Sequence, residues 1–215
     1  MSDRYEFPGL PLNPVRPGRT LLVQGDTVGG AVEFVLRGTD PVDGREDEGA
    51  ILVSTNTTGD ALLADRRDYG CGAAESVRVV DCVSLQQGTE PGSERVEGVS
   101  TPADLTGIGM RVSAFYQQLQ SAGRDRIRLG VLSASTLLMY SELRRVSRFV
   151  HVLTGRVAAT DGVAFVSVDP AAHEERVVST LQQLCDGRVE FRTEGDERQV
   201  RIGGLPGQPD GWTPF

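Results

Sequence analysis

Short strand-like runs alternate with longer amphipathic helical runs along most of this chain, and that alternation limits the folds open to it. The strand-like runs are rich in leucine or β-branched residues and are bounded by glycine or polar residues, which is typical of strands buried on both faces. Seven strands are predicted, at Arg19–Gln24, Ala50–Thr55, Val77–Val83, Ile127–Ala134, Val163–Val168, Arg188–Arg192 and Gln199–Ile202. Because parallel neighbours require crossover connections, the alternation predicts an α/β fold in which helices flank a mostly parallel central sheet.

The predicted helices carry apolar residues at steps of three and four. The clearest one begins at Thr101, whose hydroxyl is expected to cap it, with Pro102 at its first position and Gly123 just past its end. The others run from Ser141 to about Ala159, from about Glu174 to Asp186, and through Phe34 and Leu36 after the first strand.

The last two strands are predicted to form an antiparallel hairpin around the turn Glu194–Glu197. The stretches 38–49 and 84–100 contain too few apolar residues to fold alone and are predicted to be exposed loops. The chain is therefore divided into an extended N-terminal segment (1–17), one domain (18–206) and an aromatic tail (207–215). The tail carries Trp212 and Phe215 and is expected to pack along its own domain.

The charge balance narrows the classes of partner. All 22 basic residues are arginines, so there is no lysine for Schiff-base chemistry or for gripping a phosphate. The 30 acidic residues give a net charge of −8, which repels nucleic-acid backbones and anionic membrane surfaces. No apolar run is long enough to span a bilayer, and a cytoplasmic protein is expected. An acidic, lysine-free composition indicates adaptation to a very salty cytoplasm.

The spacing of cysteines and histidines predicts no metal site. Cys71, Cys82 and Cys185 are odd in number and form no CxxC, so reduced, buried thiols are expected. The two histidines show neither HxH nor HxxxH spacing. His151 is interpreted as a partly buried structural residue of a helix. His173 is interpreted as part of the cap of the next helix, although its place after a central strand also suits a ligand site.

Three groups of arginines are interpreted as solvated faces or subunit contacts, although isolated exposed ion pairs contribute little to stability. They are Arg66 and Arg67; Arg124, Arg126 and Arg128; and Arg144, Arg145 and Arg148. Ser133 and Ser135 lack a GxSxG context, so serine hydrolase chemistry has no support.

A glycine-rich turn follows the first strand and is the candidate cofactor site. Gly25, Gly29 and Gly30 could aim backbone N–H groups at an anion. The spacing of the outer two matches the phosphate-binding pattern GxxxxGK[ST]. Ala31 stands where that pattern has its lysine, and Val32 where it has a hydroxyl. A tight turn without a ligand is therefore favoured over an anion site.

Several stretches together resemble one family. They are LLVQGDTVGG at the glycine turn, ILVSTNTTGDALL at the second strand, RLGVLSASTLLMYSE at the fourth, VSVDPAAHEERVVSTLQQLCDGRVEFR further on, and the closing VRIGGLPGQPDGWTPF. From about Pro17 to Phe215 the chain resembles the KaiC-like branch of the RecA superfamily of P-loop ATPases, in a short, degenerate haloarchaeal form. The resemblance implies a RecA-like P-loop NTPase fold with a C-terminal antiparallel hairpin.

The resemblance also implies that the catalytic equipment has been lost. In active relatives an acidic residue closes the fourth strand and holds magnesium, and Leu132 stands at that place. A carboxylate after the second strand activates water, and Asn56 replaces it; an amide orients water but cannot take its proton. Together with Ala31 and Val32, four positions depart from the active pattern. No catalytic residue, metal or cofactor is therefore predicted, and ATP binding is expected to be weak at best.

On this basis the chain is predicted to be a pseudo-ATPase, not an enzyme, that acts in regulation or assembly within signalling. Two alternatives stay open: a sensor that binds nucleotide without hydrolysing it, and an accessory protein of DNA recombination or repair. The resemblance implies a protein partner, such as an active KaiC-like or signalling protein, and homo-oligomerisation. Neither a membrane nor a nucleic acid is expected as a partner.

Overall fold

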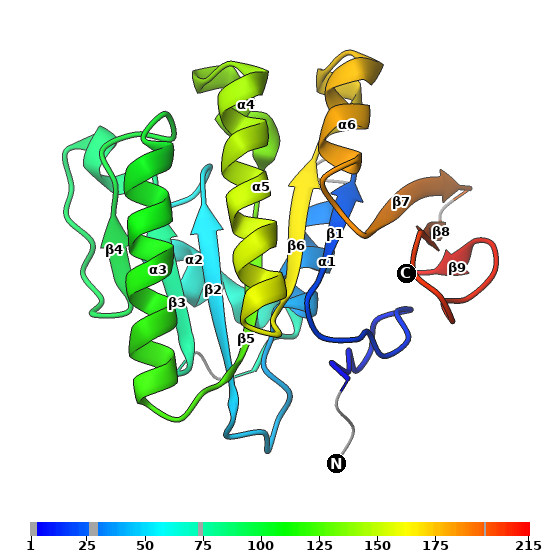
Figure 1. The fold of residues 1–215 in the computed structure, drawn as a ribbon, viewed down its shortest axis with the longest axis horizontal. Coiled ribbons are helices and arrows are strands. Elements are labelled where there is room, and N and C mark those ends of the chain that lie inside the picture. The colour runs from blue at the N-terminus through cyan, green and yellow to red at the C-terminus, as the bar shows by residue number, and fades with distance from the viewer. Residues whose placement is uncertain (1–3, 26–29, 73–74, 196) are drawn as a thin grey trace.

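The computed structural model describes residues 4–25, 30–72, 75–195 and 197–215, and its strands form one sheet (Figure 1). In these ranges the sheet has nine strands in the order β4-β3-β2-β5-β6-β1-β7-β8-β9. The strands are β1 (Arg19–Gln24), β2 (Glu48–Ser54), β3 (Val77–Asp81), β4 (Val96–Gly98), β5 (Arg126–Val131), β6 (Val163–Val168), β7 (Gly187–Glu194), β8 (Glu197–Gly203) and β9 (Thr213–Pro214).

The pairing is parallel from β4 to β7, and β8 and β9 are antiparallel additions at one edge. The α/β class, the seven predicted strands and the C-terminal hairpin are confirmed. Two strands were not predicted. β4 lies inside the stretch 84–100 that was expected to be a loop, and β9 lies inside the tail.

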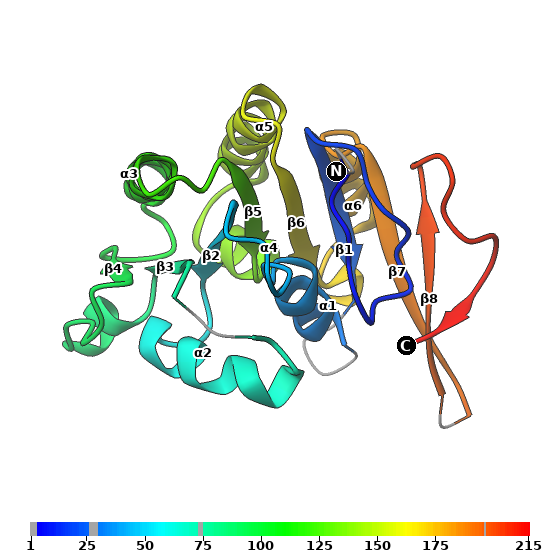
Figure 2. The same cartoon turned by 90° about the horizontal axis from the view of Figure 1, so that it is seen from below.

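Helices cover both faces of the sheet (Figure 2). α3, α5 and α6 lie on one face, and α1 and α2 lie on the other. The helices are α1 (Ala31–Gly38), α2 (Gly59–Asp65), α3 (Leu105–Ser121), α4 (Ala134–Tyr140), α5 (Leu143–Ala159) and α6 (Glu175–Gln182), with short 3-10 turns at Arg66–Tyr69, Ser84–Gln87 and Pro170–Ala172. Within the described ranges, no helix has the length and apolar content to cross a membrane.

Two predicted boundaries were wrong for reasons that the hydrogen bonds show. Asp104 caps α3, because its carboxylate accepts a hydrogen bond from the N–H of Gly107 at 2.8 Å, whereas Thr101 lies in the preceding turn. The strand expected to reach Ala134 ends at Val131. The chain turns there because the Ser133 hydroxyl accepts a hydrogen bond from the N–H of Thr136 at 3.1 Å and so caps α4.

The sheet is buried on both faces, which explains its leucine- and valine-rich strands. Along β1, Leu22 packs into the cluster under α3 and α5, while Leu21 and Val23 pack into the cluster under α1 and α2. All three side chains have an exposed fraction of 0%. A few aromatic contacts reinforce the second cluster, such as the edge-to-face pair of Phe34 and Phe165, whose ring centroids lie 6.1 Å apart.

A buried ion pair anchors the N-terminal segment near the amino ends of the strands. Arg128 of β5 donates from Nε to the carboxylate of Glu48 at 2.9 Å and from Nη2 to the carbonyl of Glu6 at 2.9 Å. Its guanidinium also lies over the ring of Tyr5, 5.2 Å from the centroid. The Arg128 and Glu48 side chains are 0% and 1% exposed. A buried pair of this kind is costly to break by removing one partner.

The prediction that the arginine groups form solvated faces was therefore wrong for Arg128. It was also wrong for Arg66, which is buried and paired with Asp40. By contrast, Arg144, Arg145 and Arg148 are exposed, as predicted.

Other contacts of the N-terminal segment reach distant parts of the chain. The Tyr5 hydroxyl donates to the carbonyl of Asp161 at 3.0 Å. The Asn13 side chain donates to the carbonyl of Gly207 at 2.8 Å, and the Asn13 N–H donates to the side-chain oxygen of Gln208 at 2.9 Å. The segment thus joins elements that are far apart in the sequence.

Candidate functional site

The carboxyl ends of the parallel strands lie along one edge of the sheet, and the residues singled out by sequence follow those ends. Gly25 follows β1, Asn56 comes shortly after β2, Leu132 follows β5 and Asp169 follows β6. In open α/β sheets, ligands bind outside these ends. This edge is therefore the candidate site.

The described part of the glycine turn is packed against aromatic rings. The N–H of Gly25 donates to the carbonyl of Val168 at 3.0 Å, which ties the turn to β6. A Cβ added to Gly25 would lie 2.9 Å from Cδ2 of Phe191. At Gly30, where φ is +103°, an added Cβ would lie 2.8 Å from Cε1 of Phe215. Both glycines thus have a packing reason that needs no ligand. The third predicted glycine, Gly29, lies outside the described residues.

Three phenylalanine rings form a cluster beside this turn. The centroids of Phe34 and Phe191 are 5.9 Å apart, those of Phe34 and Phe215 are 5.6 Å apart, and those of Phe191 and Phe215 are 5.5 Å apart. The N–H of Phe215 donates to the carbonyl of Arg198 at 2.8 Å and fixes the tail beside β8. The tail packs along its own domain, as expected. No pattern in the sequence predicted that the Phe215 ring would lie against the glycine turn.

The structure places the four positions at which the sequence departs from the active pattern near this edge of the sheet. Ala31 and Leu132 are buried, with exposed fractions of 1% and 6%. Val32, Asn56 and Leu132 border one cavity of about 110 Å³, together with Ser54 and Tyr69 among others. The structure thus brings residues from α1, from the turn after β5 and from the loop after β2 to one place. The three side chains contribute two alkyl groups and one amide. The carboxylate among the lining residues of the cavity is that of Asp65, an exposed residue at the end of α2.

The Asn56 side chain is already hydrogen-bonded. Its Oδ1 accepts from the hydroxyl of Thr136 and, at 3.4 Å, from the hydroxyl of Thr55. The Thr136 hydroxyl also lies 3.1 Å from the Ser133 oxygen. Thr136 was not predicted at this site, because nothing in the sequence distinguishes it from an ordinary helix residue. The arrangement holds an amide among hydroxyls and contains no group that takes a proton from water near neutral pH.

A buried carboxylate at the same edge was also missed. Asp81 ends β3 and accepts hydrogen bonds from the N–H groups of Gly59 at 2.7 Å, Val83 at 2.7 Å and Ser84 at 3.0 Å, and from the Ser84 hydroxyl at 2.6 Å. Burial by itself raises the pKa of Asp81, but these hydrogen bonds outweigh it, and the net pKa lies below its usual value. Asp81 therefore holds the start of α2 and the turn after β3 together, and its lone pairs are occupied.

The histidines and cysteines do not assemble a site. His151 is exposed, so the prediction of a partly buried residue was wrong. His173 is half-buried and precedes α6, but the N-terminal cap residue of that helix is Glu174, with no side-chain hydrogen bond, so the capping role was also wrong. Burial raises the pKa of the Cys82 and Cys185 thiols to about 12, which disfavours nucleophilic thiolates. Within the described ranges, no group of three His, Cys, Asp or Glu side chains could hold a metal ion.

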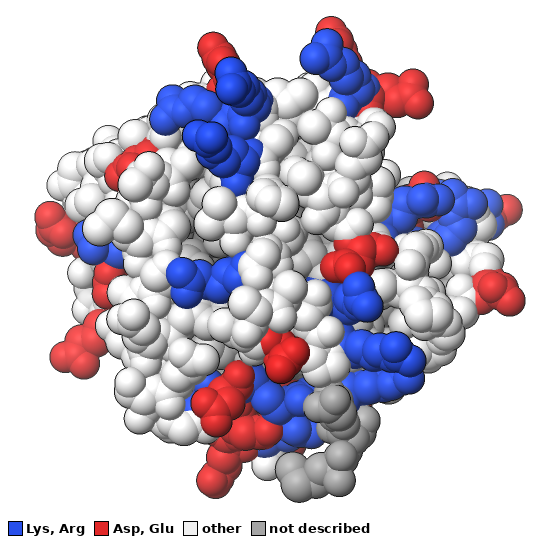
Figure 3. All heavy atoms as spheres, viewed as in Figure 1, with Lys and Arg blue, Asp and Glu red and all other residues white. Residues whose placement is uncertain are grey.

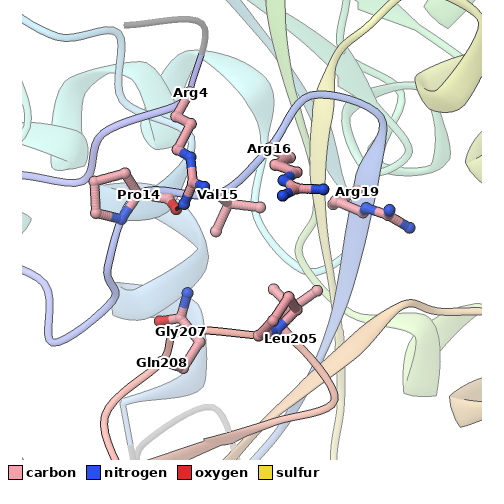
Figure 4. A pocket seen from close by; sticks show the side chains of 9 residues that line it. Arg4, Pro14, Val15, Arg16, Arg19, Leu205, Gly207 and Gln208 are labelled. Atoms are coloured by element: carbon pink, nitrogen blue, oxygen red, sulfur yellow. Dashed lines mark hydrogen bonds between the residues drawn. The ribbon is translucent and has the colours of Figure 1, made fainter.

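A separate hollow lies at the opposite end of the sheet (Figure 4). It has a volume of about 200 Å³ between the N-terminal segment and the loop after β8, and Arg4, Arg16, Arg19 and Leu205 are among its lining residues. Arg19 is paired with Asp186 at 2.5 Å, and Arg4 donates to the carbonyl of Pro14 at 3.4 Å. The Arg19 and Arg4 guanidinium groups thus serve contacts within the chain, and no described lining residue supplies a nucleophile or a carboxylate.

Comparisons with known proteins agree with this fold. A family model described as a family of unknown function (DUF7504) matches residues 18–191. Among solved structures, the chain is similar to a KaiC-like protein from the hyperthermophilic archaeon Pyrococcus horikoshii OT3, with a TM-score of 0.73 and 13% sequence identity, over 100% of this chain and 94% of that one. No curated protein matches. At this identity the likeness shows a KaiC/RecA-like fold and leaves the chemistry to be argued from the residues.

Proposed function

Because the chain belongs to the DUF7504 family, whose function is unknown, we propose its role from the residues at the sheet edge. It is a regulatory or assembly protein that keeps a KaiC/RecA-like scaffold and does not hydrolyse ATP. It acts by contact with another protein in a signalling pathway. Its acidic, lysine-free composition supports a saline cytoplasm as its setting.

One observation carries the proposal: the aliphatic residues Val32 and Leu132 and the amide of Asn56 border a single cavity at the carboxyl ends of the strands. Phosphoryl transfer is catalysed almost wholly by positioning and by charge stabilisation. A P-loop enzyme supplies that charge with a lysine, a metal-binding hydroxyl and a metal-holding carboxylate. Here the residues at those places are Ala31, Val32 and Leu132, so the site does not fit magnesium and ATP.

The free energy that the missing groups would contribute is large enough to predict that ATP hydrolysis is abolished and not merely slowed. A single preorganised donor aimed at developing charge contributes about 3 kcal/mol to catalysis, or about a hundredfold in rate. The cation, both metal anchors and the base are absent together at the four positions. Burying phosphate charge beside the alkyl group of Leu132, which is 6% exposed, would add a desolvation cost without compensation.

The rings at the glycine turn support the same conclusion for binding. The close approach of Phe191 to Gly25 and of Phe215 to Gly30 gives each glycine a packing role. A nucleotide phosphate at this place would meet aromatic carbon from β7 and from the tail. We therefore expect no measurable binding of nucleotide at millimolar concentration.

An ATPase assay with a matched variant tests the proposal. The purified chain is assayed in molar potassium chloride with magnesium and ATP, beside Asn56→Ala and a mock preparation. We expect all three rates to coincide. A rate for the unmodified chain that is well above both others would overturn the proposal, since a contaminating ATPase would not respond to Asn56→Ala.

Calorimetry separates the proposal from a sensor that binds without hydrolysis. Titration with millimolar ATP and ADP should give no heat of binding. A heat of binding, together with no hydrolysis, would replace the proposed role with that of a nucleotide-responsive sensor.

A further inference from the structure

A groove between α3 and α5 lies on the face of the sheet away from α1 and α2, where it faces the viewer in Figure 3. Its volume is about 650 Å³. In Figure 3 the surface between these helices is mostly uncharged, and basic side chains gather over the upper end of α5. The groove belongs to no part of the candidate site.

The floor of the groove is apolar and built from small residues on the α3 side. Gly109, Ser113 and Ala114 line it, and the Ser113 hydroxyl donates to the carbonyl of Gly109 at 2.8 Å, which satisfies that hydroxyl within its own helix. A Cβ added to Gly109 would meet nothing within 4 Å. Met110 and Val152 border the groove with exposed fractions of 64% and 59%. The chain thus leaves apolar surface here that none of its described residues covers.

The charge of the groove is opposite to that of the molecule. Arg145, Arg148 and Arg156 line it, and no acidic residue is among its lining residues. The whole chain carries a net charge of −8. Arg156 lies over the Tyr116 ring, 5.6 Å from its centroid. Within the described ranges, no acidic side chain pairs with Arg145 or Arg148, whereas nearby Arg111 pairs with Glu97 at 3.2 Å.

The position of Arg145 also works against the stability of its own helix. α5 begins at Leu143, so Arg144 and Arg145 lie in its first turn, which contains no acidic residue. The positive end of the helix dipole disfavours cations in that turn. These arginines therefore have no stabilising role within the chain that the contacts reveal, and an acidic partner would supply one.

We propose that the groove between α3 and α5 binds an acidic amphipathic helix of a partner protein. The inference rests on the proposed function and deepens it by naming the surface and the chemistry of the partner. A helix fits because two long parallel ridges leave a channel that accepts apolar side chains at steps of three and four. Its flanking Asp or Glu side chains would meet Arg145, Arg148 and Arg156. A nucleic acid would satisfy the arginines but leave the apolar floor unmatched.

Three synthetic peptides test the proposal directly. Each has 17 residues, the length of α3 and of α5, and the same leucine stripe, with flanks of Glu, Gln or Lys. Fluorescence anisotropy with the full chain should show the Glu peptide binding about tenfold more tightly than the Gln peptide, with the Lys peptide weakest. The preference for Glu should shrink as salt rises.

Variants of the chain test whether the peptides bind in the groove between α3 and α5. Gly109→Phe should fill the channel and weaken the Glu peptide about tenfold or more. Arg145→Glu with Arg148→Glu should reverse the preference toward the Lys peptide, and it should fold, since acidic residues suit the first turns of a helix. Arg176→Glu changes an exposed arginine on α6, outside the groove, and serves as the matched control.

Equal affinity for the three peptides, or an unchanged preference after charge reversal, would overturn the inference. So would self-association in sedimentation that Gly109→Phe abolishes, which would make a second copy the occupant. Binding to anionic phosphatidylglycerol vesicles that charge reversal abolishes would point to a membrane instead. Failure of peptide binding leaves the absence of ATP hydrolysis untouched, and ATP hydrolysis would remove the proposed function whatever the peptides do.

Discussion

Asp81 shows at the residue scale how a buried charge is held by backbone groups. Its carboxylate accepts three backbone N–H groups and one hydroxyl. We expect Asp81→Asn to lower the free energy of unfolding by about 2 to 4 kcal/mol, because an amide NH₂ would face buried donors. Urea denaturation measures the change. Asp68→Asn, at an exposed position, is the control and should change the free energy by less than about 0.5 kcal/mol.

The lowered pKa of Asp81 predicts how the effect of Asp81→Asn on the free energy of unfolding changes with pH. Because the folded-state pKa is lowered, the carboxylate contributes stability above the unfolded value of about 3.9, and that contribution is lost as pH falls through the folded value. The difference in unfolding free energy between the unmodified chain and Asp81→Asn should therefore be constant near neutral pH and shrink in acid. A difference that grows in acid would show that the carboxylate is not the stabilising form.

Single residues were predictable from sequence where local pattern decides their place. The positions of Asn56 and Leu132 at one edge follow from strand order and from the resemblance. The burial of Arg128 could not be predicted, because its partner Glu48 lies 80 positions away and both are charged residues that are normally exposed. The aromatic contact with Gly30 depends on Phe215, which returns to the turn only in three dimensions.

At the scale of elements, the start of α3 gives a test of capping. Asp104→Ala should cost about 1 kcal/mol of unfolding free energy, because it removes the side-chain acceptor for the Gly107 N–H. Thr101→Ala should cost less, since both hydrogen bonds that the Thr101 hydroxyl accepts lie outside the helix: one from the Ala103 N–H at 3.3 Å and one from Nε2 of Gln86 at 3.2 Å. Thermal or urea unfolding ranks the two variants. Equal losses of unfolding free energy would mean that Thr101 caps the helix as effectively as Asp104 does.

Two glycines make a matched pair with opposite expected effects. Gly30→Ala should destabilise the chain by about 1 to 3 kcal/mol, because φ is +103° and the Phe215 ring is too close to a Cβ. Gly109→Ala should stabilise it by about 1 kcal/mol, since it lies inside α3 with open space beside it. Denaturation curves for both measure the sign. A stabilising Gly30→Ala would mean that the turn does not need its glycine.

Elements with strong periodicity were predicted well, and short ones were not. β1 and β6 match their predicted ranges because each is a buried apolar run with clear polar or glycine ends. β4 has only the residues Val96–Gly98, too few for a pattern, and it forms because β3 offers a free edge. α4 was missed because its apolar run continues that of β5, and periodicity alone cannot separate the two.

At the scale of the whole molecule, the net charge of −8 predicts salt-dependent stability. Self-repulsion is screened by salt, so the Tm should rise between about 0.2 M and about 2 M potassium chloride. Calorimetric scans measure the change. The double variant Glu90→Gln with Glu94→Gln, at two exposed positions, should raise the Tm at low salt and flatten its salt dependence. A Tm that does not respond to salt would contradict the interpretation of the composition.

The N-terminal segment imposes an order of events on a chain that is made from one end. Tyr5 needs the carbonyl of Asp161, and Asn13 needs Gly207 and Gln208. Residues 4–15 leave the ribosome long before these partners are synthesised. These contacts therefore cannot form until Asp161, Gly207 and Gln208 have been synthesised. A late stage of folding is then a closing step in which residues 4–15 dock onto segments that are synthesised much later.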